Sequence, residues 1–258
     1  AMKNILKIML MMITIFTIAG SAVYAAEIPV SDQDQLITSS DWTEISNLQD
    51  EMKKEEPDVT IDYDKALKVY VDCNLIKLQT ADTKKLTSAL ESANYVWVIP
   101  FKMEKTYGMF TVAKGLPLRE EAKSVLTKAE QEEVKNHAGK WMITETAEHT
   151  VEPYYDILLE KREALSDCTR VVLVGSQPGM RQPVALGMDD ETARIWISLG
   201  YQYPVMEKIP ETQNVESGVY SFESVADISD TYIEDSEVST GAGVQSRSSM
   251  KYVAGIGI

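Results

Sequence analysis

The chain has 258 residues, of which 40 are acidic and 25 are basic, and its formal net charge is −15. A field of this sign repels phosphate backbones and anionic lipid head groups, so nucleic acid is excluded from the expected partners. The length and the uneven distribution of apolar residues indicate one folded domain with polar tails.

The N-terminus has the three-part pattern of a secretory signal peptide. Lys3 and Lys7 precede the apolar run Ile8–Ala19, and small residues follow up to Ala25. We therefore predict that a signal peptide lies within residues 1–26, is cleaved after Ala25, and directs the protein outside the cytoplasm, either secreted or attached to the cell surface. An uncleaved anchor helix is the alternative, although the run is shorter than the roughly 20 residues that a bilayer requires.

The next segment, residues 27–58, is polar and acidic. Its apolar side chains Trp42, Ile45, Leu48 and Met52 recur at helical spacing, which predicts a short amphipathic helix at about 41–54. Pro57 ends that helix. The segment either docks onto the domain through this apolar stripe or acts as a spacer from the membrane.

Residues 59–205 are predicted to form a single α+β globular domain. The expected elements are, in chain order, a strand in the second half of Ala66–Leu78, a helix over Asp82–Ala93, a hairpin of Tyr95–Phe101 and Tyr107–Ala113, helices over Pro117–Leu126 and Thr127–Asn136, a strand over Lys140–Thr146, a helix over Thr150–Leu165, and strands over Val171–Val174, Val184–Met188 and Ala193–Leu199. Strands that come in runs, mixed with helices, favour a mainly antiparallel sheet with several packing helices. The last three strands would form a C-terminal three-stranded meander.

The composition changes again after Tyr203. Residues 206–250 are acidic and rich in Ser and Thr, which is typical of a linker or stalk. The apolar end, residues 251–258, is interpreted as the start of a truncated membrane anchor, and this is the one route by which we expect a membrane contact. A frayed apolar tail is the alternative, because seven apolar residues cannot span a bilayer.

The loop Gly175–Pro183 is the most site-like stretch of the predicted domain. It follows a strand and contains Gln177, Arg181 and Gln182, which we take as the candidate binding residues for an unknown protein or small ligand. It matches neither a Walker loop nor a G-x-S-x-G nucleophile elbow. The simpler interpretation is a connection between two strands.

The two cysteines, Cys73 and Cys168, allow two interpretations. In an exported chain they are candidates for a disulfide. Alternatively, both are unpaired thiols buried as small hydrophobic side chains.

Catalytic and metal patterns are weak throughout the sequence. A thiol enzyme would need Cys73 or Cys168 beside His137 or His149, and none of these residues has a recognisable catalytic context. The cluster closest to a metal site is explained better by surface charge than by ligation, and no metal or cofactor is predicted. Its members are Glu145, Glu148, His149 and Glu152.

These observations favour a non-enzymatic cell-surface or secreted binding module over an enzyme. The alternative is an extracellular hydrolase that uses a pair of carboxylates or one Cys/His pair. A deep pocket lined by Cys168 or by a pair of glutamates would favour the hydrolase.

Overall fold

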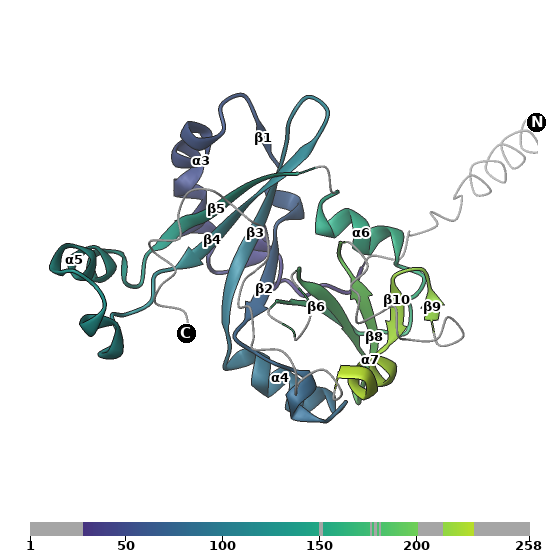
Figure 1. Ribbon diagram of the computed structural model, residues 1–258. Coiled ribbons are helices and arrows are strands. Elements are labelled where there is room, and N and C mark those ends of the chain that lie inside the picture. The colour runs from purple at the N-terminus through teal and green to yellow at the C-terminus, as the bar shows by residue number, and fades with distance from the viewer. Residues whose placement is uncertain are drawn as a thin grey trace, which may run out of the picture.

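A mostly antiparallel sheet of ten strands runs through the computed structural model (Figure 1). The structure describes residues 28–149, 152–175, 177, 180, 182–200 and 214–229. The predicted signal peptide, the apolar end and most of the predicted linker lie outside the described residues. Among the described helices, none is both long and apolar enough to cross a membrane.

The strands follow the order β5-β4-β3-β2-β6-β7-β8-β10-β9, and β1 pairs separately with β3. Their bounds are β1 Thr60–Ile61, β2 Leu67–Val71, β3 Asn94–Lys102, β4 Tyr107–Lys114, β5 Trp141–His149, β6 Arg170–Val174, β7 Val184–Met188, β8 Ala193–Ser198, β9 Asn214–Glu216 and β10 Val219–Ser221. β2 and β6 pair in parallel, whereas the other paired strands are antiparallel. The predicted mixed fold with a mainly antiparallel sheet is confirmed. The predicted meander, β6 to β8, is only part of a longer antiparallel series, because β10 and β9 extend it.

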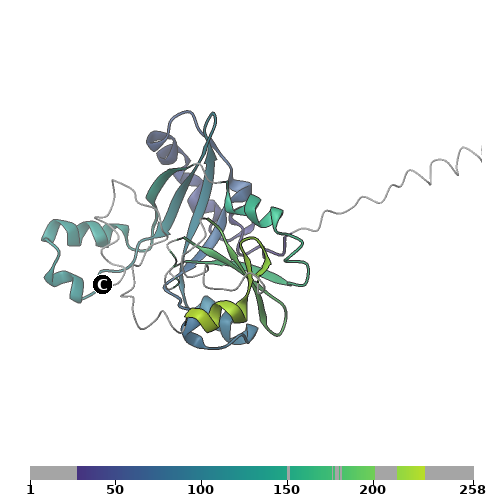
Figure 2. The ribbon, with the colours of Figure 1, turned by 45° about the vertical axis from the view of Figure 1, so that its right-hand side comes forward.

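The helices are short, and several are single turns. Their bounds are α2 Trp42–Ile45, α3 Gln49–Glu55, α4 Thr83–Glu91, α5 Lys128–His137, α6 Tyr154–Glu160 and α7 Phe222–Ser229, with 3-10 turns η1 Leu36–Thr38, η2 Ser46–Leu48, η3 Tyr63–Lys65, η4 Ile76–Leu78 and η5 Glu121–Ser124. The Asp82 carboxylate caps α4 by accepting from two backbone N–H groups, and Thr127 and Glu130 form a capping box on α5. α5 buries none of its side chains and projects from the body of the molecule (Figures 1 and 2).

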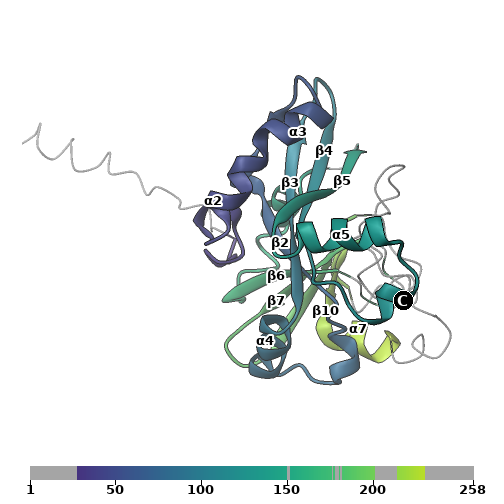
Figure 3. The ribbon, with the colours of Figure 1, turned by 90° about the vertical axis from the view of Figure 1, so that its left-hand side faces the viewer.

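Alternation along the strands divides the core between the two faces of the sheet. On one face, α4 and α7 cover β6, β7 and β8 and form the lower cluster, whose helices lie together in Figures 1 and 2. On the same face, α2 and α3 cover β3 and β4 and form the upper cluster (Figure 3). The opposite face carries a third cluster, which includes residues of α6. Tyr70 of the lower cluster is the cross-strand partner of Tyr95, which packs against both clusters, and such partners point to the same side of a sheet. The upper and lower clusters therefore lie side by side.

The folded unit extends beyond the expected 59–205 at both ends. Leu36, Ile45 and Met52 are fully buried in the upper cluster, so the N-terminal segment docks onto the domain and is not a spacer. At the other end, β9, β10 and α7 belong to the sheet and the lower cluster, although their sequence lies in the predicted linker. Low apolar content concealed both segments, yet each supplies several buried side chains to the core. They are Leu36, Ile45 and Met52 in the first segment and Val219, Tyr220, Phe222 and Val225 in the second.

Two predicted helices are shorter than expected. The span Pro117–Leu126 contains only the turn η5, and the predicted helix Thr150–Leu165 is reduced to α6. In the span Pro117–Leu126 no side chain of η5 is buried, so tertiary packing does not stabilise a longer helix there.

Candidate functional site

The predicted binding loop is anchored to the interior through Gln177. This side chain is only 3% exposed, and its Nε2 donates to the carbonyl oxygens of Cys73 at 2.6 Å and Gly175 at 3.0 Å. Its Oε1 accepts from the backbone N–H of Leu75 at 3.2 Å. Gln177 therefore ties the loop to the chain that follows β2, and its amide is used in buried hydrogen bonds.

The other two candidates in the loop differ in placement. Gln182 is half-buried against Gly200, where an added Cβ would lie 1.3 Å from Gln182 Oε1. Arg181 lies outside the described residues. The structure thus does not gather Gln177 and Gln182 into one binding surface, and the loop acts at these two positions as a packed connection.

Both cysteines are free and buried, which matches the second interpretation of the pair. Cys73 belongs to the lower cluster and Cys168 to the cluster on the opposite face of the sheet. Burial raises the pKa of both thiols, and for Cys168 it does so to about 11, with smaller contributions from Asp167 and Asp189. Each thiol is therefore held in its protonated form at neutral pH.

Within the described part of the chain, no group of three or more His, Cys, Asp or Glu side chains could hold a metal ion. Glu145 on β5 has a buried Oε1 without a hydrogen-bond partner, and burial raises its pKa to about 7. His137, the last residue of α5, uses Nδ1 to contact the carbonyl of Glu133 at 2.9 Å.

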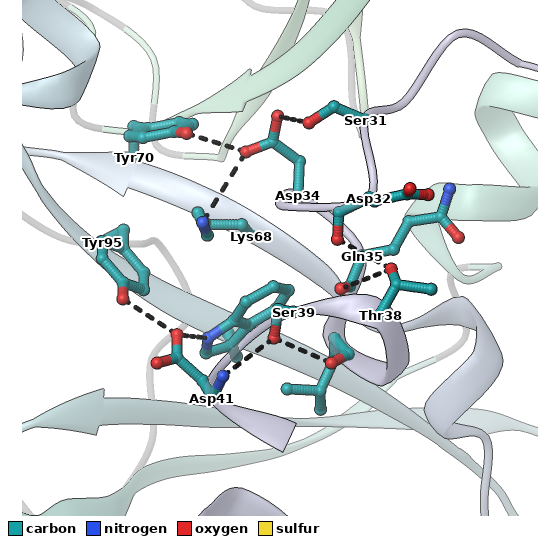
Figure 4. Close-up of polar contacts among 12 residues, drawn as sticks. Ser31, Asp32, Asp34, Gln35, Thr38, Ser39, Asp41, Lys68, Tyr70 and Tyr95 are labelled. Carbon is teal, nitrogen blue, oxygen red and sulfur yellow. Dashed lines mark hydrogen bonds and ion pairs between the residues drawn. The ribbon is translucent and has the colours of Figure 1, made fainter. Parts of the chain in front are cut away.

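A polar centre that the sequence did not predict lies between the upper and lower clusters. Asp34, which is only 2% exposed, is its core. Asp34 accepts hydrogen bonds from Ser31 Oγ at 2.6 Å and Tyr70 Oη at 2.7 Å (Figure 4). It also accepts from Arg170 Nη2 at 3.1 Å. Lys68 Nζ lies 3.9 Å from Asp34 Oδ1.

A second carboxylate and three aromatic rings complete the polar centre. Asp41 Oδ2 accepts from Tyr95 Oη at 2.9 Å and from Trp97 Nε1 at 3.0 Å. Lys68 Nζ lies 4.6, 5.2 and 5.8 Å from the ring centroids of Tyr95, Trp97 and Tyr70. Burial lowers the pKa of Lys68 and raises the pKa of both tyrosines.

The polar centre holds the N-terminal segment on the sheet. Asp34 and Asp41 come from that segment, whereas Lys68 comes from β2 and Arg170 from β6. The two carboxylates balance the two cations, and aromatic faces surround the ammonium group. Sequence offered one signal for this site: Lys68 is a single charge within the apolar strand β2, on the same face as Tyr70.

A pocket of about 610 Å³ opens at the start of β8. The chain before α4, the turn after α6, the first residues of β8 and the first turn of α7 enclose it. Its lining residues are Gln79, Thr80, Ala81, Ala164, Asp167, Cys168, Thr192, Ala193, Arg194, Ile195, Ser221, Phe222, Glu223 and Ala226. The lining therefore combines small and apolar side chains with hydroxyl, amide and charged groups.

The charged groups in and around the pocket differ in their contacts and in their exposure to solvent. Arg194 Nε donates to Asp189, which also accepts from the backbone N–H groups of Thr192 at 2.6 Å and Glu191 at 2.8 Å. These backbone bonds, followed by Arg194, lower the pKa of Asp189. Asp167 and Glu223 contribute two further, exposed carboxylates to the lining. Because Asp189 already neutralises Arg194, the rim has a negative charge.

Comparison of the chain with protein-family models, with curated proteins and with solved structures found no match.

Proposed function

We propose that the protein is an exported, non-enzymatic binding module, secreted or attached to the cell surface, and that the pocket at the start of β8 receives a small ligand carrying an amino group. The observation that carries the proposal is this 610 Å³ pocket with its negative rim. Its volume is in the range of small-molecule sites, roughly 300–1,000 Å³. Export is supported by the pattern of Lys3, Lys7 and the apolar run that follows.

The distribution of charge favours a cation over an anion. Arg194 is occupied by Asp189, while Asp167 and Glu223 face the rim as exposed carboxylates. The ring of Phe222 and the methyl groups of nearby alanines offer contact to a short aliphatic chain. The net charge of −15 would also attract such a ligand from a distance.

Calorimetric titration with putrescine and succinate, which have carbon chains of equal length and opposite charge, tests this proposal. We expect putrescine to bind at one site at low ionic strength and succinate not to bind. Asp167→Asn and Glu223→Gln should each weaken putrescine binding by about two- to fivefold, as expected for partly solvated charge pairs. Glu163→Gln, which removes an exposed acid absent from the pocket lining, is the matched control. Equal binding by all three variants, or equal binding of succinate, would refute the proposal.

A second candidate, an extracellular hydrolase, has one observation in its favour, because Cys168 lines this pocket. The chemistry around the thiol opposes it. A pKa of about 11 leaves roughly one thiolate in ten thousand at neutral pH. Histidine is also missing from the lining.

Native alkylation with iodoacetamide separates the two functions. For a binding module, Cys168 should react slowly at neutral pH and faster as the pH rises toward 11. Rapid labelling at neutral pH that is lost in a Cys168→Ser variant would favour the thiol hydrolase instead.

A further inference from the structure

The polar centre brings an amine and a carboxyl group together in a largely solvent-shielded space. Lys68 Nζ lies 3.9 Å from Asp34 Oδ1, and their side chains are 11% and 2% exposed. Near-attack separations are roughly 3–3.5 Å, so a short movement of the flexible lysine side chain would bring Nζ onto Asp34 Cγ. The two residues are remote in sequence, since Asp34 precedes η1 and Lys68 lies on β2.

Burial of Lys68 makes loss of a proton from its ammonium group easier than in water. Burial is the largest influence on the Lys68 ammonium group and lowers its pKa, against the opposing effects of Asp34 and Asp41. The rings of Tyr95 and Trp97 flank Nζ on β3 and limit its access to water.

The surroundings of Asp34 place donors where negative charge would develop. Tyr70 Oη donates to Oδ1, and Ser31 Oγ and Arg170 Nη2 donate to Oδ2. If an amine attacked Cγ, these donors would stabilise the oxyanion of the tetrahedral intermediate without reorganisation of solvent. Arg170 and Tyr70 are held in place on β6 and β2, so the donors are fixed by the sheet.

We propose that Lys68 and Asp34 form an intramolecular isopeptide bond in the folded protein. One proton passes from the ammonium group to the carboxylate, which yields a neutral amine and a carboxylic acid. The nitrogen lone pair then attacks Cγ, and the new N–C bond forms. The C–OH bond breaks, and the hydroxyl group leaves as water with a second proton from nitrogen. The amide and one water molecule balance the starting ion pair, so no oxidant or other reactant is required.

The bond would fasten the N-terminal segment to the centre of the sheet. That segment supplies Leu36, Ile45 and Met52 to the upper cluster, and its detachment would expose them. A covalent link between Asp34 and Lys68 would prevent complete separation even after local unfolding, as a disulfide does by constraining the unfolded chain. The free thiols Cys73 and Cys168 do not provide such a link.

Intact mass and peptide mapping of the folded, full-length chain test the proposal. We expect the mass to be lower than the sequence mass, corrected for the observed N-terminus, by one water molecule. Trypsin should then release a branched peptide in which the peptide containing Asp34 and ending at Lys53 is joined to Ala66–Lys77, with Lys68 uncleaved. A mass equal to the sequence mass, with cleavage after Lys68, would overturn the proposal and leave an ion pair.

Three variants sharpen the assignment. Lys68→Arg keeps the cation but should restore the full sequence mass. Asp34→Ala removes the carboxyl carbon that the amine would attack and should likewise restore the full sequence mass. Lys65→Arg is the matched control, because Lys65 Nζ lies closer to Asp156 Oδ2, at 2.8 Å, but in a half-exposed pair, and the mass deficit should remain. A deficit that persists in Lys68→Arg would contradict the proposed bond, and the wild-type peptide map decides the question if a variant does not fold.

Discussion

Truncation of Leu36 should show that the N-terminal segment is part of the cooperative fold. Leu36 is 0% exposed in the upper cluster, whereas its neighbour Ile37 is 38% exposed. We expect Leu36→Ala to lower the free energy of unfolding by about 2–5 kcal/mol, the range for a buried leucine that leaves a cavity. Ile37→Ala, the matched control, should change it by about 0.5 kcal/mol or less, as for most surface substitutions.

Urea unfolding followed by tryptophan fluorescence measures the difference. With a slope of about 1–3 kcal/mol per molar urea, a loss of 3 kcal/mol, within the range above, shifts the midpoint by roughly 1–3 M. Trp97 lies in the upper cluster and Trp196 in the lower one, so both helix-covered parts of the sheet are reported. Equal midpoints for Leu36→Ala and Ile37→Ala would refute the assignment of this segment to the core.

Three further predictions concern single side chains. Burial raises the pKa of Glu145 from 4.5 to about 7, so folding favours its protonated form, and the free energy of unfolding should fall as the pH rises between these values. Glu145→Gln should remove that fall, as measured by urea midpoints across the range. A variant with the same pH profile as the wild type would contradict the prediction. Gln177→Ala leaves the buried N–H of Leu75 unpaired and should cost about 1–3 kcal/mol in the same assay; a wild-type midpoint would show that the loop is not anchored there. Alkylation in denaturant without reductant should label both Cys73 and Cys168, and protection of both thiols would reveal a disulfide that the structure lacks.

The elements that sequence predicted well have strong local signals. Asp82 caps α4, and Thr127 with Glu130 forms the box that begins α5. The β3–β4 hairpin follows from two β-rich runs joined by a short charged loop. These features depend on residues that are neighbours in sequence, so they can be read without knowledge of the tertiary structure.

The parts that sequence missed depend on contacts between distant residues. Asp34 and Asp41 belong to an acidic stretch for which both docking and a spacer role were open, and only β2 and β6 show that Asp34 has buried partners. The parallel pairing of β2 with β6 creates that site, and no local pattern predicts which strands become neighbours. The pocket likewise joins four separate segments. Conversely, Gln177 resembled a surface residue because turn residues surround it, yet its amide satisfies buried backbone groups.

The most direct test of the proposed function is a map of backbone amide chemical shifts as putrescine is added to the folded protein. This measurement separates a defined site from general attraction to a chain with a net charge of −15. We predict that the perturbed amides cluster around the pocket, at Thr80, Ala193, Arg194 and Phe222. Perturbations spread over the acidic surface, or centred on the loop that contains Gln177, would contradict the assignment of this pocket as the binding site.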